Sequence, residues 1–166
     1  VNELLRQFDP CTDADGVLEA DAAGHLVISI ELRRLFDHFL AASGEEPIAT
    51  MRARIIAVLR ARLPATAAAE AIEILDRYLA YRDAARRLVP PSADPVAGLD
   101  QVHDLRGKMF SPAVVKAFFA DEEAAIYAAL ARRDVLADTT LSPAERERRL
   151  AEIDARTPAA VRDARA

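Results

Sequence analysis

Proline placement constrains the fold of this chain more than any other sequence feature. A proline at the first position of a helix loses no hydrogen bond, and a Ser, Thr or Asp before it can accept from the free amides of the helix start. Glu145 follows Ser142 by three residues, as in a capping box. Pro47 and Pro64 mark two earlier starts, and no helix crosses Pro90-Pro91. Four pairs combine a cap with a proline: Asp94-Pro95, Ser111-Pro112, Ser142-Pro143 and Thr157-Pro158.

Between these prolines, large apolar residues recur at the three- and four-residue spacing of a helix face, which predicts about eight helices. The one strand-like region, residues 17–20 and 25–28 around 21–24, is compatible with a short β-hairpin, which is marginal unless it packs on helices. The sequence therefore predicts an all-α fold. The apolar stripes include Leu32, Leu35, Phe36, Phe39 and Leu40; Ile48, Met51, Ile55 and Leu59; Ile72, Leu75 and Leu79; Val115, Phe118 and Phe119; Ile126 and Leu130; and Leu150 and Ile153.

The density of large apolar residues suggests a division of the chain into three parts. Residues 1–16 are a leader or linker, and residues 17–89 form a mini-domain of three helices with short links. Residues 90–166 are expected to form shorter, more charged helices. The last part, 138–166, is poor in large apolar groups. Because such helices bury little against one another, we expect that they need an outside partner or form an extended arm.

Composition excludes several classes of protein. The net charge of −5, without a basic block, argues against a nucleic-acid binder. Cys11 is the only cysteine, so neither an internal disulfide nor a cysteine-based metal site can form. No run of about 18 apolar residues predicts a transmembrane helix. The chain begins at Val1 instead of Met, so we expect that an upstream segment has been removed.

The residue types needed for catalysis or metal binding do not form a known pattern. The serines lack a small-residue nucleophile elbow, and His25, His38 and His103 show no paired-histidine motif. The run that begins at Cys11 imitates part of an EF-hand loop, but it has Ala22 where a bidentate Glu is needed. We therefore expect no catalytic residue, no metal and no cofactor, and we interpret the chain as a binding protein, not an enzyme.

Residues 33–45 are the most informative run. Arg33 and Asp37 lie four residues apart, so they can pair across one helical turn. Gly44 follows the last apolar position and suits a left-handed helix cap. Taken singly, Phe36 is most simply a core residue, and the charges are ordinary solvated groups. On pattern alone, a non-catalytic helical structural or oligomerisation domain would be the favoured interpretation.

The same run carries a resemblance to a known family. The lipase-specific foldases, or lipase chaperones, have a signature of Arg, two variable residues, Phe-Asp-Tyr, one variable residue, Leu-Ser-Ala, one variable residue and Gly-Glu. His38 stands here where Tyr is usual, and Ala41 where Ser is usual. Residues 75–82 and 141–150 are similar to the family as well. The positions that match in register are Arg33, Phe36, Asp37, Leu40, Ala42, Gly44 and Glu45.

The chain thus resembles the amino-terminal half of a foldase, and the resemblance implies a function. Such a protein is a steric chaperone that binds a secreted bacterial triacylglycerol lipase and assists its folding in the periplasm, without a cofactor. The family fold has two helical mini-domains joined by an extended helical arm, and an N-terminal segment, absent here, anchors the full-length protein to the inner membrane. The implied partner-binding residues are Arg33, Phe36, Asp37, His38, Leu40, Ala42, Gly44 and Glu45.

Overall fold

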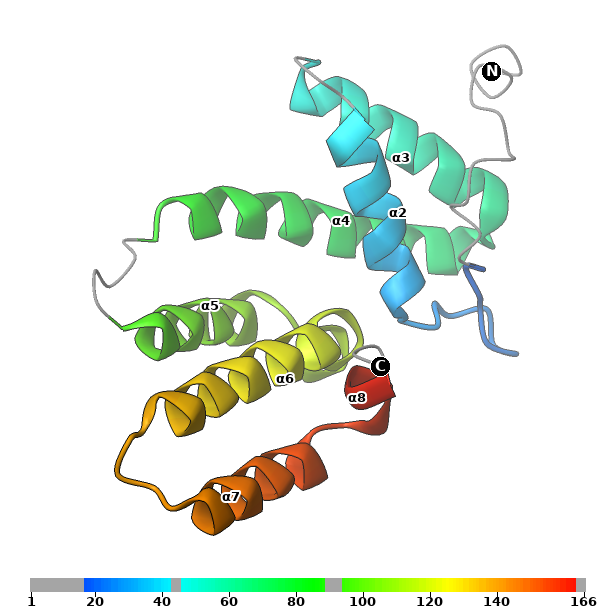
Figure 1. Ribbon diagram of the computed structural model, residues 1–166. Coiled ribbons are helices and arrows are strands. Elements are labelled where there is room, and N and C mark those ends of the chain that lie inside the picture. Colours follow the sequence, from blue (N-terminus) through cyan, green and yellow to red (C-terminus); the bar gives the residue numbers. More distant parts are fainter. Residues whose placement is uncertain (1–16, 43–45, 89–93, 164–166) are drawn as a thin grey trace. The chain divides into compact units, whose positions relative to one another are not determined.

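The computed structural model describes residues 17–42, 46–88 and 94–163, and these contain seven helices and no strand (Figure 1). This confirms the predicted all-α fold. Cys11, Gly44, Glu45 and Pro90-Pro91 lie outside the described residues. The helices are α2 (Ile30–Ala42), α3 (Ile48–Arg62), α4 (Ala65–Arg86), α5 (Pro95–Met109), α6 (Pro112–Ala137), α7 (Pro143–Arg156) and α8 (Ala159–Asp163).

Three of the four predicted caps are confirmed. The Asp94 carboxylate accepts from the amides of Val96 and Ala97 at the start of α5, at 2.9 and 3.3 Å. The hydroxyls of Ser111 and Ser142 each accept one backbone amide at the starts of α6 and α7, at 3.4 and 3.2 Å. A proline occupies the beginning of each of these helices. The sequence therefore fixes where each of them begins.

Two predictions about the later helices are wrong. The Thr157 hydroxyl donates backwards to the carbonyl of Ile153 at 2.8 Å, so it ends α7 instead of capping α8. The stripes predicted as two helices within residues 112–137 form one helix, α6, of 26 residues. No Gly or Pro follows Pro112 within this alanine-rich helix, so nothing in its local sequence interrupts it.

The region predicted as a hairpin is a chain reversal with a single isolated antiparallel bridge between Ala20 and Leu26. Gly24 takes the positive φ of 87° that this turn requires. The Glu70 carboxylate of α4 accepts the Leu26 amide at 2.7 Å and contacts Nδ1 of His25 at 2.6 Å. A reversal this short is marginal alone, and Glu70 ties it to the helices.

The chain divides into two compact units, and the division falls within α4 between Ala80 and Tyr81. The first unit contains α2, α3 and most of α4, which are the three helices predicted for the mini-domain. The proposed domain boundary at residues 89–90 stays a prediction. The core of this unit consists of Leu32, Leu35, Phe36, Phe39, Met51, Ile55, Leu59, Leu63, Ala67, Ala68, Ala71, Leu75 and Tyr78.

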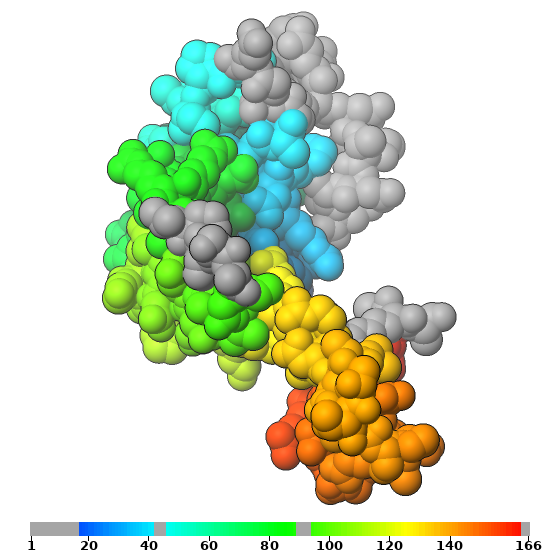
Figure 2. Space-filling model, turned by 60° about the vertical axis from the view of Figure 1, so that its left-hand side comes forward, coloured from blue at the N-terminus to red at the C-terminus, as the bar shows by residue number. Residues whose placement is uncertain are grey.

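The second unit is centred on α6, which packs against α5, α7 and α8. Its core is aromatic, because Phe110, Phe118, Phe119 and Tyr81 are all buried. This core is more substantial than the sequence analysis expected. By contrast, α7 contributes no buried residue and lies against the later part of α6 as an outer layer (Figure 2). No helix among the described residues is both long and apolar enough to cross a membrane.

Candidate functional site

The helical period sorts the residues of the 33–45 motif by exposure. Phe36 is completely buried, together with its neighbours Leu32 and Leu35 on the same face of α2. Leu40 is half-buried, whereas His38 is exposed. The His38 ring lies edge-on to Phe39, with ring centroids 5.6 Å apart. The motif therefore combines core positions with an outward-facing imidazole.

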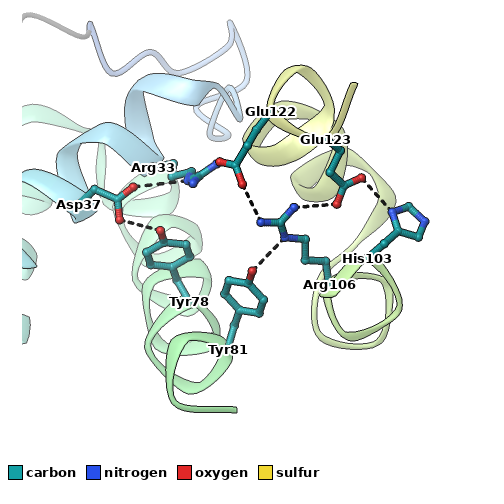
Figure 3. Close-up of polar contacts among 8 residues, drawn as sticks. All are labelled: Arg33, Asp37, Tyr78, Tyr81, His103, Arg106, Glu122 and Glu123. Carbon is teal, nitrogen blue, oxygen red and sulfur yellow. Dashed lines mark hydrogen bonds and ion pairs between the residues drawn. The ribbon is translucent and has the colours of Figure 1, made fainter. Parts of the chain in front are cut away.

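The two charged residues of the motif on α2, Arg33 and Asp37, lie next to each other (Figure 3). Arg33 Nε lies 3.4 Å from Asp37 Oδ2, which confirms the predicted pair across one turn. The Arg33 side chain is only 18% exposed and that of Asp37 is 42% exposed. The pair is thus less exposed than a simple surface ion pair, and its orientation is set by its surroundings.

Tyr78 of α4 supplies the second contact of Asp37. Its hydroxyl donates to Asp37 Oδ1 at 2.6 Å, and its ring lies 5.6 Å from that of Phe36 (Figure 3). Burial raises the pKa of Tyr78 to about 12, and the neighbouring Asp37 carboxylate adds to the shift. The hydroxyl therefore keeps its proton and donates throughout the neutral range. Sequence analysis missed this contact, because nothing in the sequence links positions 41 residues apart.

A second cross-helix contact reaches α4 close by. Arg52 of α3 donates from Nε and Nη2 to the two carboxylate oxygens of Asp76, at 2.6 and 2.9 Å. These hydrogen bonds lower the pKa of Asp76. Both side chains are nearly half exposed, so water competes for the same groups. This forked pair joins α3 to α4 and offers a comparison for the Tyr78 contact.

The second unit contains a buried charge cluster around Arg106 of α5. Its guanidinium donates from Nη1 to Glu123 Oε1 at 2.7 Å, from Nη2 to Glu122 Oε1 at 2.9 Å, and from Nε to the Tyr81 hydroxyl at 2.9 Å (Figure 3). The guanidinium carbon also lies 4.0 Å from the centre of the Phe119 ring. Arg106 is 5% exposed and Glu123 is 7% exposed.

Opposing effects act on the charge of Arg106. Burial lowers its pKa, but the hydrogen bonds to Glu123, Tyr81 and Glu122 outweigh burial and raise the pKa above its ordinary value. The other oxygen of Glu123 contacts Nδ1 of His103 at 2.8 Å. Sequence analysis missed this cluster, because Arg106 and the two glutamates look like surface charges on separate helices.

The histidines and acids of the described residues form no catalytic or metal-binding arrangement that we can identify. His25 contacts Glu70, His103 contacts Glu123, and His38 lies on the exposed side of α2. No group of three or more His, Cys, Asp or Glu side chains in residues 17–42, 46–88 and 94–163 is placed to hold a metal ion.

Comparison with known proteins places the chain in a family. The family model of the proteobacterial lipase chaperone protein matches residues 74–166. The chain belongs to this family. The resemblance inferred from the sequence is thereby confirmed. The matched segment includes Tyr78 and the whole Arg106 cluster, so the family pattern spans the helices that build the second unit.

Individual relatives agree with this assignment. The chain is 38% identical to a lipase chaperone of Ectopseudomonas mendocina and 37% identical to one of Stutzerimonas stutzeri, in each case over 92% of this chain and 47% of the relative. It is 33% identical to a lipase chaperone of Chromobacterium violaceum, over 93% of this chain and 51% of the relative. The chain thus spans about half the length of the curated relatives that it matches.

Proposed function

We propose that this protein binds a secreted bacterial triacylglycerol lipase and assists its folding to the active state. The observation that carries this proposal is membership of the lipase chaperone family, with relatives 33–38% identical over more than nine tenths of the chain. We also propose a binding role without catalysis. By analogy with the family, the site of action is the periplasm, and an N-terminal segment of the full-length protein anchors it to the inner membrane.

The proposed partner-binding residues are those of the 33–45 motif, and their exposure suggests two roles. His38 is exposed and Asp37 is 42% exposed, so both can touch a partner. Phe36 is fully buried and supports the surface from beneath. The remaining proposed residues are Arg33, Leu40, Ala42, Gly44 and Glu45.

The second unit also offers apolar surface to a partner. Leu136 of α6 is 58% exposed and Ile126 is 39% exposed. The adjoining helix α7 has no fully buried residue, although its Leu150 and Ile153 are half-buried. Apolar side chains such as these are available for contact with a partner.

A preformed surface can assist folding without a nucleotide. A client that docks on a rigid scaffold in its near-native arrangement loses less conformational freedom on the way to its active fold. The Arg106 cluster and the aromatic core hold the helices of the second unit in a fixed arrangement, as such a scaffold requires. The free energy that assists folding then comes from binding of the client, not from hydrolysis of a nucleotide.

Refolding of a denatured lipase tests this function. The secreted triacylglycerol lipase of the bacterium that makes this chain is diluted from denaturant with the full chain, with an unrelated helical protein, or alone. We expect ester hydrolysis to recover faster and further only in the first sample. Equal recovery in all three samples would refute the proposed chaperone role.

A further inference from the structure

A short side-chain contact of the lipase-chaperone motif comes from a residue outside the motif. The Tyr78 hydroxyl lies 2.6 Å from Asp37 Oδ1, a short hydrogen bond to a carboxylate, whereas Arg33 Nε lies 3.4 Å from Oδ2. Hydrogen bonds to charged groups strengthen as they shorten. Tyr78 therefore adds a short hydrogen bond from α4 to the restraint that Arg33 places on the Asp37 carboxylate.

Tyr78 can restrain Asp37 because the tyrosine side chain is itself held in place by packing. Tyr78 is 3% exposed, and its ring packs on the fully buried Phe36. An aspartate that is 42% exposed would otherwise sample several rotamers in water. With the hydroxyl fixed in the core, the bond from Tyr78 narrows the orientations open to the Asp37 carboxylate.

The contact also ties the side of α2 that carries Asp37 to α4. Tyr78 belongs to α4, so its bond to Asp37 joins two helices within the first unit. Successive residues of a helix point about 100° apart. A contact that holds the Asp37 side of α2 against α4 therefore also limits the direction in which the adjacent His38 points. His38 is the exposed aromatic residue of the motif.

We propose that Tyr78 is a positioning residue for lipase binding: its hydroxyl fixes Asp37 and thereby orients the face of α2 that carries His38. The inference rests on the proposed function, because it concerns the surface that meets the lipase. It adds a residue outside the 33–45 run, on a different helix. Tyr78 need not touch the lipase to act.

A purely structural role of Tyr78 predicts a different result from a positioning role, and a variant of Arg52 distinguishes the two roles. The Arg52–Asp76 pair also joins a neighbouring helix to α4 in the same unit, but that helix is α3 instead of α2. Asp76 lies only two residues before Tyr78. If general tightening of the unit were sufficient, loss of either tie would weaken the lipase interaction alike. If positioning of Asp37 matters, only loss of the Tyr78 hydroxyl should do so.

The experiment compares Tyr78→Phe, Arg52→Gln and the unsubstituted full chain, with the same bacterium's denatured lipase as probe. Tyr78→Phe keeps the ring and its packing on Phe36. We expect it to keep the helical content of the parent and to lower the lipase reactivation rate, at subsaturating chaperone, by about tenfold, the factor given by a modest loss of binding free energy. Arg52→Gln should reactivate at the parental rate.

A second comparison tests whether Tyr78 acts through Asp37. Asp37→Asn alone should slow reactivation, and adding Tyr78→Phe to it should cause little further loss, because the contact is already weakened. The inference would be overturned if the double variant lost activity by the product of the two single losses. Parental activity of Tyr78→Phe, or an equal loss in Arg52→Gln, would also overturn it. If the unsubstituted chain itself fails to speed reactivation, the proposed function falls and the inference falls with it.

Discussion

Replacing Arg106 with methionine should destabilise the protein strongly. Among the described residues, Arg106 and Glu123 are the charged residues that are buried, and their side chains are 7% and 9% exposed. Methionine has a similar length and no charge, so it fills much of the space but provides no donor. The substitution leaves Glu123 buried with its contact to His103, and it removes the hydrogen bonds that Arg106 donates to Glu122 and Tyr81.

The expected loss follows from the burial of the remaining charge. Removing one partner of a buried ion pair costs about 3–5 kcal/mol, because an uncompensated charge stays out of water. We expect the lower end, about 3 kcal/mol, because Glu123 keeps its contact with His103. Urea unfolding followed by circular dichroism should show a midpoint lowered by roughly 1–3 M, given the usual slope for small domains.

Two further variants decide whether burial is the cause. Arg106→Met combined with Glu123→Met should recover much of the loss, because apolar replacement of a whole buried pair is often neutral. Arg52→Gln, which breaks a forked pair exposed by 42% and 47%, should leave the midpoint almost unchanged. A parental midpoint for Arg106→Met, or a double variant no more stable than the single one, would refute the reasoning.

Three other predictions follow from individual contacts. The pKa of His25 is raised above 6.5 and that of Glu70 is lowered below 4.5, so their contact is lost as pH rises through the raised pKa of His25 or falls through the lowered pKa of Glu70. Protection of the Leu26 amide from hydrogen exchange should therefore peak between about pH 4.5 and 6.5, and Glu70→Gln should flatten this profile. Ser142→Ala should cost the start of α7 about 1 kcal/mol, seen as faster amide exchange there, and Ser142→Thr should restore it; unchanged exchange in the alanine variant would exclude the cap. His38→Ala should unfold at the parental urea concentration yet capture less lipase in a pull-down, and parental capture would remove His38 from the proposed surface.

The family assignment was available from local sequence because it depends on which residues stand at which spacing. Arg33, Phe36 and Asp37 match the signature wherever the helices lie in space. The pairing of Arg33 with Asp37 was equally predictable, since both belong to one helix and one turn separates them. Their identification as a lipase-binding surface stays a prediction.

The substitution of His38 for the usual tyrosine takes on a clearer meaning in the structure. The side chain is exposed and edge-on to Phe39, so the substitution does not disturb the core. The aromatic hydroxyl that holds Asp37 comes from α4, at Tyr78. The histidine therefore changes the chemistry of the outward face, and the contact between Tyr78 and Asp37 does not depend on it.

The sequence by itself determined the all-α fold, the starts of α5, α6 and α7, and the family. These depend on backbone chemistry and spacing within a few residues: a proline without an amide hydrogen, a capping side chain beside it, and a helical apolar period. Only the tertiary structure decided that the second unit has an aromatic core, that Arg106 is buried between two glutamates, and that Tyr78 holds Asp37. Those contacts join residues 16 to 41 positions apart, and their strength depends on burial, which the local pattern does not specify.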